Sequence, residues 1–285
     1  MRGPRWGDRL LAIHAWAVYA FLYAPIVVLI VFSFNDSRFS FWRGFTLRWY
    51  AAMFQNDQII RAAQNSLVVA AVTMVGATLL GTLTAFVLVR HRFAGKSLLE
   101  ALVYVPIILP SVIMGVSLLA TFVLAGLRPG RTAIILGHVA FAAAFAAVAI
   151  RARLVGFDRN LERAAMDLGA GRWHTFRYVT LPLVWPGILA GALLAFTLSL
   201  DDVVITFFTA GPGATTLPLY IFSSVRLGVS PEINALSTLI LLITAGALIL
   251  ADRVRRWGLD AAEPAAGAGD RGERGNLERM GGGEP

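Results

Sequence analysis

Residues 158–182 read DRNLERAAMDLGAGRWHTFRYVTLP and form a polar stretch between two apolar runs. Small and apolar residues recur at helical spacing in its first half, so one face of a short helix is apolar. Gly169 follows this pattern and suits a helix stop, where a left-handed residue is commonly required. Such a helix fits a groove on a soluble partner, or it lies on a membrane surface as an amphipathic helix. The apolar face consists of Leu161, Ala164, Ala165 and Leu168.

The composition of the whole chain is that of a membrane protein. Of its 285 residues, 57% are hydrophobic and only 15% are charged, with a mean hydropathy of +0.69. A soluble domain is about 45–50% apolar and about 25% charged. The net charge is +8, but Lys96 is the single lysine and the arginines fall between apolar blocks. Because no basic face results, nucleic-acid binding does not explain the charge.

Six apolar runs are long enough to cross a bilayer, which takes about 20 residues. The first run exceeds the roughly 7–15 apolar residues of a signal peptide, so we expect it to be retained as a span. The sequence therefore predicts an all-α, polytopic membrane protein with six transmembrane helices. The expected spans are 10–34, 62–89, 98–125, 132–150, 183–209 and 233–251.

The flanking charges predict the orientation of these spans. Lys and Arg total 15 in the loops on one side and 7 in those on the other. By the positive-inside rule, both termini and the 151–180 loop are cytoplasmic. Residues 258–285 are rich in Gly, Ala and Glu and are expected to form a disordered cytoplasmic tail. The cytoplasmic segments are 1–9, 90–97, 151–180 and 252–257, and the external ones are 35–61, 126–131 and 210–232.

Several spans carry helix-breaking signals. Pro106 and Pro110 predict a kink in the third span, which serves either a translocation path or packing alone. Gly211-Pro212-Gly213 predicts a sharp external turn after the fifth span. Ser230-Pro231-Glu232 combines an N-cap residue, a first-turn proline and an acid, so the last helix should begin there.

The sequence contains no recognisable catalytic or metal-binding motif. It has no cysteine and no H-E-x-x-H or G-x-S-x-G pattern. The AGKS at 94–97 ends like a phosphate-binding loop, but the first glycine of that motif is replaced by Arg90. A membrane-embedded enzyme would need a nucleophile and a base, and we find an acidic pair without a matching histidine. We therefore expect no catalysis, no metal and no bound cofactor in this chain.

The acidic pair lies in LSLDDVVITFF at 198–208, inside the fifth apolar run. Adjacent residues of a helix point about 100° apart, so Asp201 and Asp202 face different surroundings. Asp201 shares an apolar face and needs a structural partner. Asp202 is either an acid that faces a cationic substrate along a path or a buried hydrogen-bonding acid that joins the span to the next loop. Its polar stripe comprises Ser199, Asp202, Thr206 and Thr209.

The 158–182 loop resembles the EAA loop of ABC-importer permeases. Ala164-Ala165-x-x-x-Gly169, followed after nine residues by Val179-x-Leu181-Pro182, has the spacing of that loop. One position departs from the pattern, because Arg163 stands where the family has a glutamate. The resemblance implies a coupling helix that docks on an ATPase subunit. The residues implied in coupling are Glu162, Arg163, Ala164, Ala165, Asp167, Leu168, Gly169, Leu181 and Pro182.

Residues 199–239 narrow the resemblance to the second permease of spermidine/putrescine-type importers. They contain Asp201-Asp202, the glycine-rich turn, Thr216-Leu217-Pro218 and Ser230-Pro231-Glu232-Ile233-Asn234 in family-like places. Together with PIILPSVIMG at 106–115, the similarity extends over most of residues 10–257. The residues implied in the substrate pathway are Asp202, Asp201, Ser199, Thr206 and Tyr220, where Tyr220 either stacks on an amine or anchors the interface.

The resemblance implies a type I ABC importer permease fold in a bacterial inner membrane, with residues 10–257 as the permease domain and 151–182 as its coupling loop. Two ATPase subunits that hold ATP and Mg²⁺, a second permease and an external binding protein would be its partners. Two alternatives remain open. One is a permease for another small organic or inorganic solute, and the other is a self-contained secondary transporter.

Overall fold

A computed structural model describes residues 6–37, 41–156, 158–228 and 230–260. The regular structure of these residues is helical, apart from one isolated bridge between Asn35 and Phe45. The all-α class is therefore as predicted. Most of the expected tail, at 261–285, lies outside the described residues. The chain divides into two compact units, one formed by Met1–Tyr50 with Pro231–Pro285 and the other by Ala51–Ser230.

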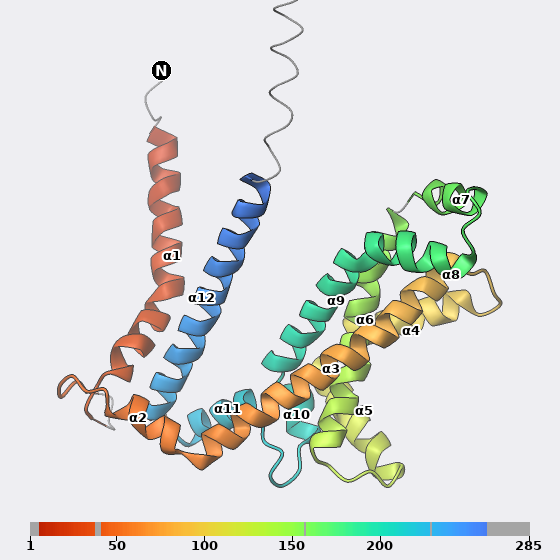
Figure 1. Ribbon diagram of the computed structural model, residues 1–285. Helices are drawn as coiled ribbons and strands as arrows, with labels where there is room; N and C mark the ends of the chain where they lie inside the picture. The colour runs from red at the N-terminus through yellow and green to blue at the C-terminus, as the bar shows by residue number, and fades with distance from the viewer. Residues whose placement is uncertain (1–5, 38–40, 157, 229, 261–285) are drawn as a thin grey trace, which may run out of the picture. The chain divides into compact units, whose positions relative to one another are not determined.

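The first unit is a pair of long helices. Helix α1 (Trp6–Ser33) packs against α12 (Pro231–Asp260), as Figure 1 shows. Helix α12 begins at Pro231 with Glu232 in its first turn, as the N-terminal signal predicted. Most large apolar side chains of α1 are exposed, which suits a surface that faces lipid.

The loop after α1 is organised around the buried Asn35. Its Oδ1 accepts the Arg43 N–H at 2.9 Å, and its Nδ2 donates to the Phe41 carbonyl at 2.9 Å. The Trp49 indole donates to the Asn35 carbonyl at 2.8 Å, which ties the loop to the short helix α2 (Arg48–Gln55). These bonds pair polar backbone groups in the described part of the loop without a helix or strand.

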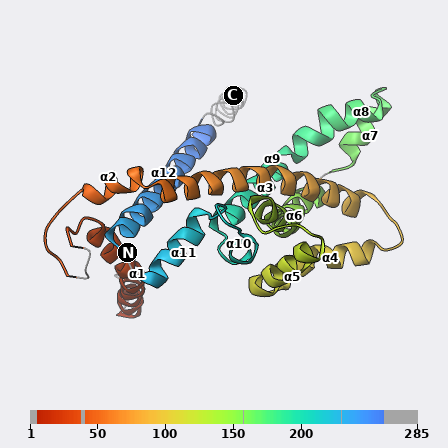
Figure 2. The same ribbon diagram turned by 90° about the horizontal axis from the view of Figure 1, so that it is seen from below.

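The second unit is a bundle centred on three long helices, α3 (Asp57–Arg90), α6 (Arg131–Val155) and α9 (Leu181–Asp201). Figure 2 looks almost along α6 and shows α3 on one side and α4 and α5 on the other. The remaining elements are α4 (Lys96–Ile108), α5 (Ser111–Leu124), α7 (Asn160–Asp167), α8 (Arg172–Thr175), the π-helical turn η1 (Phe176–Thr180), α10 (Val204–Thr209) and α11 (Leu217–Leu227).

Small residues let the three long helices approach closely. A Cβ added at Gly81 of α3 would lie 2.8 Å from the Ala146 Cβ and 2.8 Å from the Ala147 nitrogen of α6. On α9, a Cβ at Gly191 would lie 3.3 Å from the Ala146 carbonyl oxygen. Membrane helices associate through such contacts because lipid supplies no hydrophobic drive between them. A buried cluster of Ala77, Ala142 and Ala195 continues this packing.

The third predicted span is not one straight helix. The helix axis bends by 113° between α4 and α5, at Leu109 and Pro110. Pro110 lacks a backbone N–H, and its ring disfavours helical geometry in the preceding residue, so the helix ends at Ile108. The kink was predicted at the right place in the chain, but the structure has a complete break between two helices there rather than a bend within one helix.

The fifth predicted span, 183–209, is wrong at both ends. A continuous helical segment starts earlier, at Arg172, and runs through η1 to Asp201. At its other end Asp202 adopts an extended conformation, with φ −70° and ψ 128°, and the helix stops. The chain resumes a helical path only in the short α10. The acidic pair therefore lies at a helix break rather than inside a span.

Four helices of the described residues are long and apolar enough to cross a membrane: Leu10–Ser33, Asp57–Arg90, Arg131–Val155 and Arg172–Asp201. The bent pair α4 and α5 makes a fifth span if it counts as one. Pro231–Gly246 forms a shorter apolar helix. The chain is thus a multi-pass membrane protein, and the sixth span stays a prediction.

We predict that Gly81→Ala lowers the melting temperature of the detergent-solubilised protein. Alanine favours a helix over glycine by about 0.8–1 kcal/mol, so propensity alone would stabilise the variant. The new methyl group overlaps the α6 backbone, and such overpacking costs about 1–3 kcal/mol.

Gly246→Ala is the matched control, because a Cβ there meets nothing within 4 Å. Thermal melting of both variants, followed by size-exclusion chromatography, measures the difference. A Gly81→Ala protein that melts at or above the wild-type temperature contradicts the close-packing argument.

Candidate functional site

Helix α7 is a short element at one end of the bundle (Figure 1), and it ends in a closed C-terminal cap. The N–H of Gly169 donates to the Met166 carbonyl at 2.9 Å, and that of Ala170 donates to the Ala165 carbonyl at 3.0 Å. This pair of bonds is the Schellman arrangement, which requires a left-handed residue. Gly169 has φ +91°, so it stops the helix as the sequence predicted.

The apolar face of α7 is uncovered in this chain. Leu161 is 48% exposed and Leu168 is 89% exposed. Ala164 is exposed and Ala165 half-buried on the same face. Arg163 and Asp167 are exposed beside it, and Arg163 lies 3.4 Å from the Asn160 carboxamide oxygen. A short helix whose outer face carries solvent-exposed leucines is typical of elements that dock on another protein.

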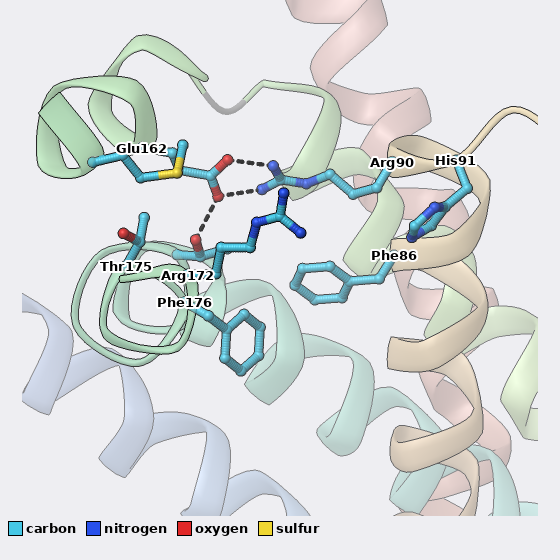
Figure 3. A pocket seen from close by; sticks show the side chains of 9 residues that line it. Phe86, Arg90, His91, Glu162, Arg172, Thr175 and Phe176 are labelled. Atoms are coloured by element: carbon cyan, nitrogen blue, oxygen red, sulfur yellow. Dashed lines mark hydrogen bonds and ion pairs between the residues drawn. The ribbon is translucent and has the colours of Figure 1, made fainter. Parts of the chain in front are cut away.

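Glu162 clamps α7 to the bundle (Figure 3). Its carboxylate forms a two-armed ion pair with Arg90, the last residue of α3, and the Arg90 Nη2 lies 2.5 Å from Oε1. The Thr180 hydroxyl at the end of η1 donates to the same oxygen. The Glu162 side chain is 13% exposed. One carboxylate therefore joins three elements, α7, α3 and η1.

The clamp keeps Glu162 ionised. The hydrogen bonds from Arg90 lower the pKa of this carboxyl below its usual value of 4.5, and the Thr180 hydroxyl acts in the same direction, whereas burial opposes them. A second arginine, Arg159, adds a favourable charge and donates to the Val89 carbonyl at 3.1 Å. The carboxylate is thus fully charged at neutral pH.

A hollow of about 450 Å³ opens beside this clamp. Figure 3 shows the Arg90 and Arg172 side chains pointing into the same space, with aromatic rings below them. Leu181 and Pro182 lie next to it along the chain and begin α9, as predicted, although the helical path extends further back. The hollow is lined by Phe86, Arg90, His91, Glu162, Met166, Arg172, Thr175, Phe176 and Thr180.

At the other end of the bundle, the helix break at Asp202 forms a second polar cluster. The Asp202 carboxylate accepts the Thr206 N–H at 2.8 Å and the Ile205 N–H at 3.4 Å, so it caps the first turn of α10. His138 of α6 lies 3.1 Å from the Asp202 Oδ2 through Nε2 and 2.8 Å from the Ser199 hydroxyl through Nδ1. The Thr206 hydroxyl contacts the same Nε2 at 3.0 Å.

This Ser–His–Asp grouping resembles a hydrolytic triad only in composition. His138 is fully buried, Ser199 is buried, and the Asp202 side chain is 10% exposed. A carboxylate only accepts hydrogen bonds, so the His138 Nε2–H donates to Asp202. A serine hydroxyl enclosed in this way reaches no substrate, and the cluster instead satisfies the polar groups of a broken helix.

The structure brings three of the five predicted pathway residues together and leaves two apart. Ser199, Asp202 and Thr206 meet around His138. Asp201 is exposed and makes no hydrogen bond or ion pair with the described residues. Tyr220 is half-buried on the separate helix α11. The pathway role of all five residues remains a prediction.

Two residues that sequence reasoning passed over complete these clusters. His138 is a polar side chain within an apolar run, and such residues usually have a partner or a function. Its position in the span could have been matched with the acidic pair. Arg90 was noted only for disqualifying a phosphate-binding loop, although it ends an apolar helix next to a loop that contains acids. Tertiary pairing of this kind has no periodic signal in the sequence.

These observations define a class: a multi-pass helical membrane protein with a short helix, α7, clamped to one end of its bundle. Comparison with known proteins specifies the class. Residues 77–258 match the family described as binding-protein-dependent transport system inner membrane component. The chain belongs to this family and is therefore a transport subunit rather than an enzyme.

Curated relatives and a solved structure agree with this assignment. The chain is 44% identical to the spermidine/putrescine transport system permease protein PotC of Escherichia coli K12, over 84% of this chain and 91% of that protein. It is 48% identical to the putrescine transport system permease protein PotI of the same strain, over 78% and 82%. A bacterial alginate ABC transporter, solved with an alginate-bound periplasmic protein, shares the fold with a TM-score of 0.65 at 20% identity, over 85% and 90%.

We predict that Arg90→Gln and Glu162→Gln each loosen α7, whereas the double variant loses little more than either single one. Neutralising one partner leaves the charge of the other largely buried without this opposite charge, at a cost of about 1–3 kcal/mol. A double-mutant cycle on melting temperature measures the coupling. Strictly additive effects would show that the pair does not hold α7.

The same pair predicts a pH dependence. Because the folded-state pKa of Glu162 is lowered, its contribution is fully present above about pH 4.5 and is lost as the pH falls through the folded-state value. The coupling free energy between Arg90 and Glu162 should therefore be smaller below pH 4.5 than at pH 7. A coupling that stays constant at acid pH argues against ionised Glu162 as the clamp.

Proposed function

We propose that this chain is a permease subunit of an ATP-binding-cassette importer for polyamines, and that α7 couples it to a separate ATPase. The observation that carries the proposal is the uncovered apolar face of α7. The opposite side of this helix is attached to α3 by the ion pair of Glu162 with Arg90. The identity to polyamine permeases over more than three quarters of the chain supports the substrate class.

The remaining parts of the importer follow from the same proposal. Two ATPase subunits would hold ATP and Mg²⁺, and this chain would bind neither. A second permease would complete the path, and a periplasmic binding protein would deliver the substrate, as the alginate transporter's complex with its periplasmic protein suggests by analogy. Both termini and the 151–182 loop would lie in the cytoplasm, in agreement with the distribution of basic residues.

For the substrate we propose a division of labour between the two aspartates. The Asp202 carboxylate is occupied by His138 and by the backbone of α10, so it shapes the break. Asp201 is exposed and has no partner among the described residues, so its charge is available to an ammonium group. This arrangement favours Asp201 as the direct contact, the reverse of the sequence-based assignment.

We predict that Gly169→Val uncouples uptake from ATP hydrolysis, because a β-branched residue is strained at φ +91° although its side chain meets open space. Such strain costs about 1–3 kcal/mol. Gly169→Asn should be milder, since asparagine tolerates this conformation.

Gly171→Val serves as the control, because Gly171 has φ −67° and ψ 160°, which valine adopts readily. ATP-dependent uptake in proteoliposomes that contain the partner subunits is the measurement. Wild-type coupling in Gly169→Val would remove α7 from the mechanism.

We predict that Asp201→Asn raises the KM for putrescine uptake by about tenfold with little change in melting temperature, since a charged hydrogen bond contributes about 1.5–3 kcal/mol. Asp202→Asn should mainly lower the melting temperature, because it weakens the contact with His138. Uptake kinetics and melting curves of the two isosteric variants separate the roles. If Asp202→Asn instead raises the KM and Asp201→Asn leaves it unchanged, Asp202 is the substrate contact.

A further inference from the structure

The hollow beside the clamp has an excess of positive charge. Arg90, Arg172 and His91 line it, and Glu162 is its single acid. That acid is already bound by Arg90 and Thr180. The Arg172 side chain makes no hydrogen bond or ion pair with the described residues, and it points into the hollow in Figure 3. Arg172 is exposed, so the site offers a guanidinium without a protein partner, which suits an anion and matches phosphate geometry in particular.

The floor of the same hollow is apolar. Phe86 of α3 and Phe176 of η1 pack edge to face, with ring centroids 5.9 Å apart, and Met166 adds a thioether from α7. A free inorganic anion gains nothing from such a floor. An anion that carries a hydrocarbon chain uses both parts of the site, the cationic rim and the apolar base.

The location of the hollow supports a lipid as that anion. It lies near the end of α3 and the start of α9, next to the loop segments 90–97 and 151–180. These two segments contain nine Lys and Arg residues and three acids. Trp173 and Tyr178 are exposed nearby, and such aromatic residues gather at the level of lipid headgroups. Basic pockets between membrane helices on the cytoplasmic side bind anionic headgroups.

The hollow and the docking face use different sides of α7. Glu162 and Met166, four residues apart, line the hollow. Leu161 and Leu168, which form the docking face, are not among its lining residues. A ligand in the hollow therefore sits between α7 and the bundle and leaves the apolar face free for a protein partner.

We propose that this hollow binds an anionic phospholipid, with the headgroup phosphate on Arg172 at the rim beside Arg90 and the first part of an acyl chain on Phe86 and Phe176. The bound lipid fills the space under α7 and stiffens its attachment to the bundle. The inference does not depend on the transported solute, because it concerns a site away from Asp201 and Asp202.

Lipid titration of the purified full-length chain tests the proposal. We expect phosphatidylglycerol to raise the melting temperature in detergent, and phosphatidylcholine at equal concentration to raise it much less. Arg172→Gln should weaken the apparent affinity for phosphatidylglycerol about tenfold, as expected for loss of a charge-assisted contact. Arg177→Gln is the matched control, since Arg177 lies five residues further along, is exposed, and does not line the hollow.

Four results would overturn the proposal. Equal stabilisation by both lipids would show that charge is not recognised. Equal protection by inorganic phosphate would show that the apolar floor is unused and that the ligand is a free anion. Equal losses in Arg172→Gln and Arg177→Gln would show a diffuse surface effect rather than a site. Loss of lipid on addition of the ATPase subunit would identify the hollow as part of the protein interface instead.

Discussion

The close approach of α3, α6 and α9 is the constraint on which the rest of the second unit depends. Gly81, Gly191 and Ala146 remove side-chain bulk where the backbones meet, so the three helices approach closely at these residues. This packing positions the side chains at both ends of the bundle. His138 on α6 then reaches Asp202 at the end of α9, and Arg90 at the end of α3 reaches Glu162 on α7.

The two polar clusters are connected by one helix. Thr180 of the Glu162 clamp precedes α9 directly, and Asp202 of the helix break follows it directly. Helix α9 has 21 residues, so it links the clusters over roughly 30 Å at 1.5 Å per residue. Helix α9 also packs against α6, where Gly187 and Gly191 lie close to Arg153 and Ile150. Under the proposed coupling of α7 to an ATPase, α9 would link a displacement of α7 to the break at Asp202.

The sequence specified the all-α class, the positions of most apolar helices and the stop at Gly169, because each of these follows from local periodicity or backbone geometry. It did not reveal the helix breaks in full. Pro182 was expected to begin a span, yet the helix runs through it from Arg172. The π-helical turn explains this difference, since the Leu181 N–H bonds the Phe176 carbonyl five residues back and the widened turn accommodates the proline. The pairing of His138 with Asp202 was equally hidden, because residues 64 apart share no local pattern.

Arg163 stands where the EAA-loop pattern has a glutamate, and the positions of Glu162 and Arg163 on the helix show what this difference changes. Residues 162 and 163 point about 100° apart, so one faces the bundle and the other faces outward. Glu162 is the inward residue and forms the clamp, whereas Arg163 is exposed beside the apolar docking face. The exchange therefore leaves the attachment of α7 intact and alters only the charge that the helix presents. Under the proposed docking of α7 on an ATPase, the groove that receives this face would meet a cation at position 163, so the exchange would bear on partner specificity.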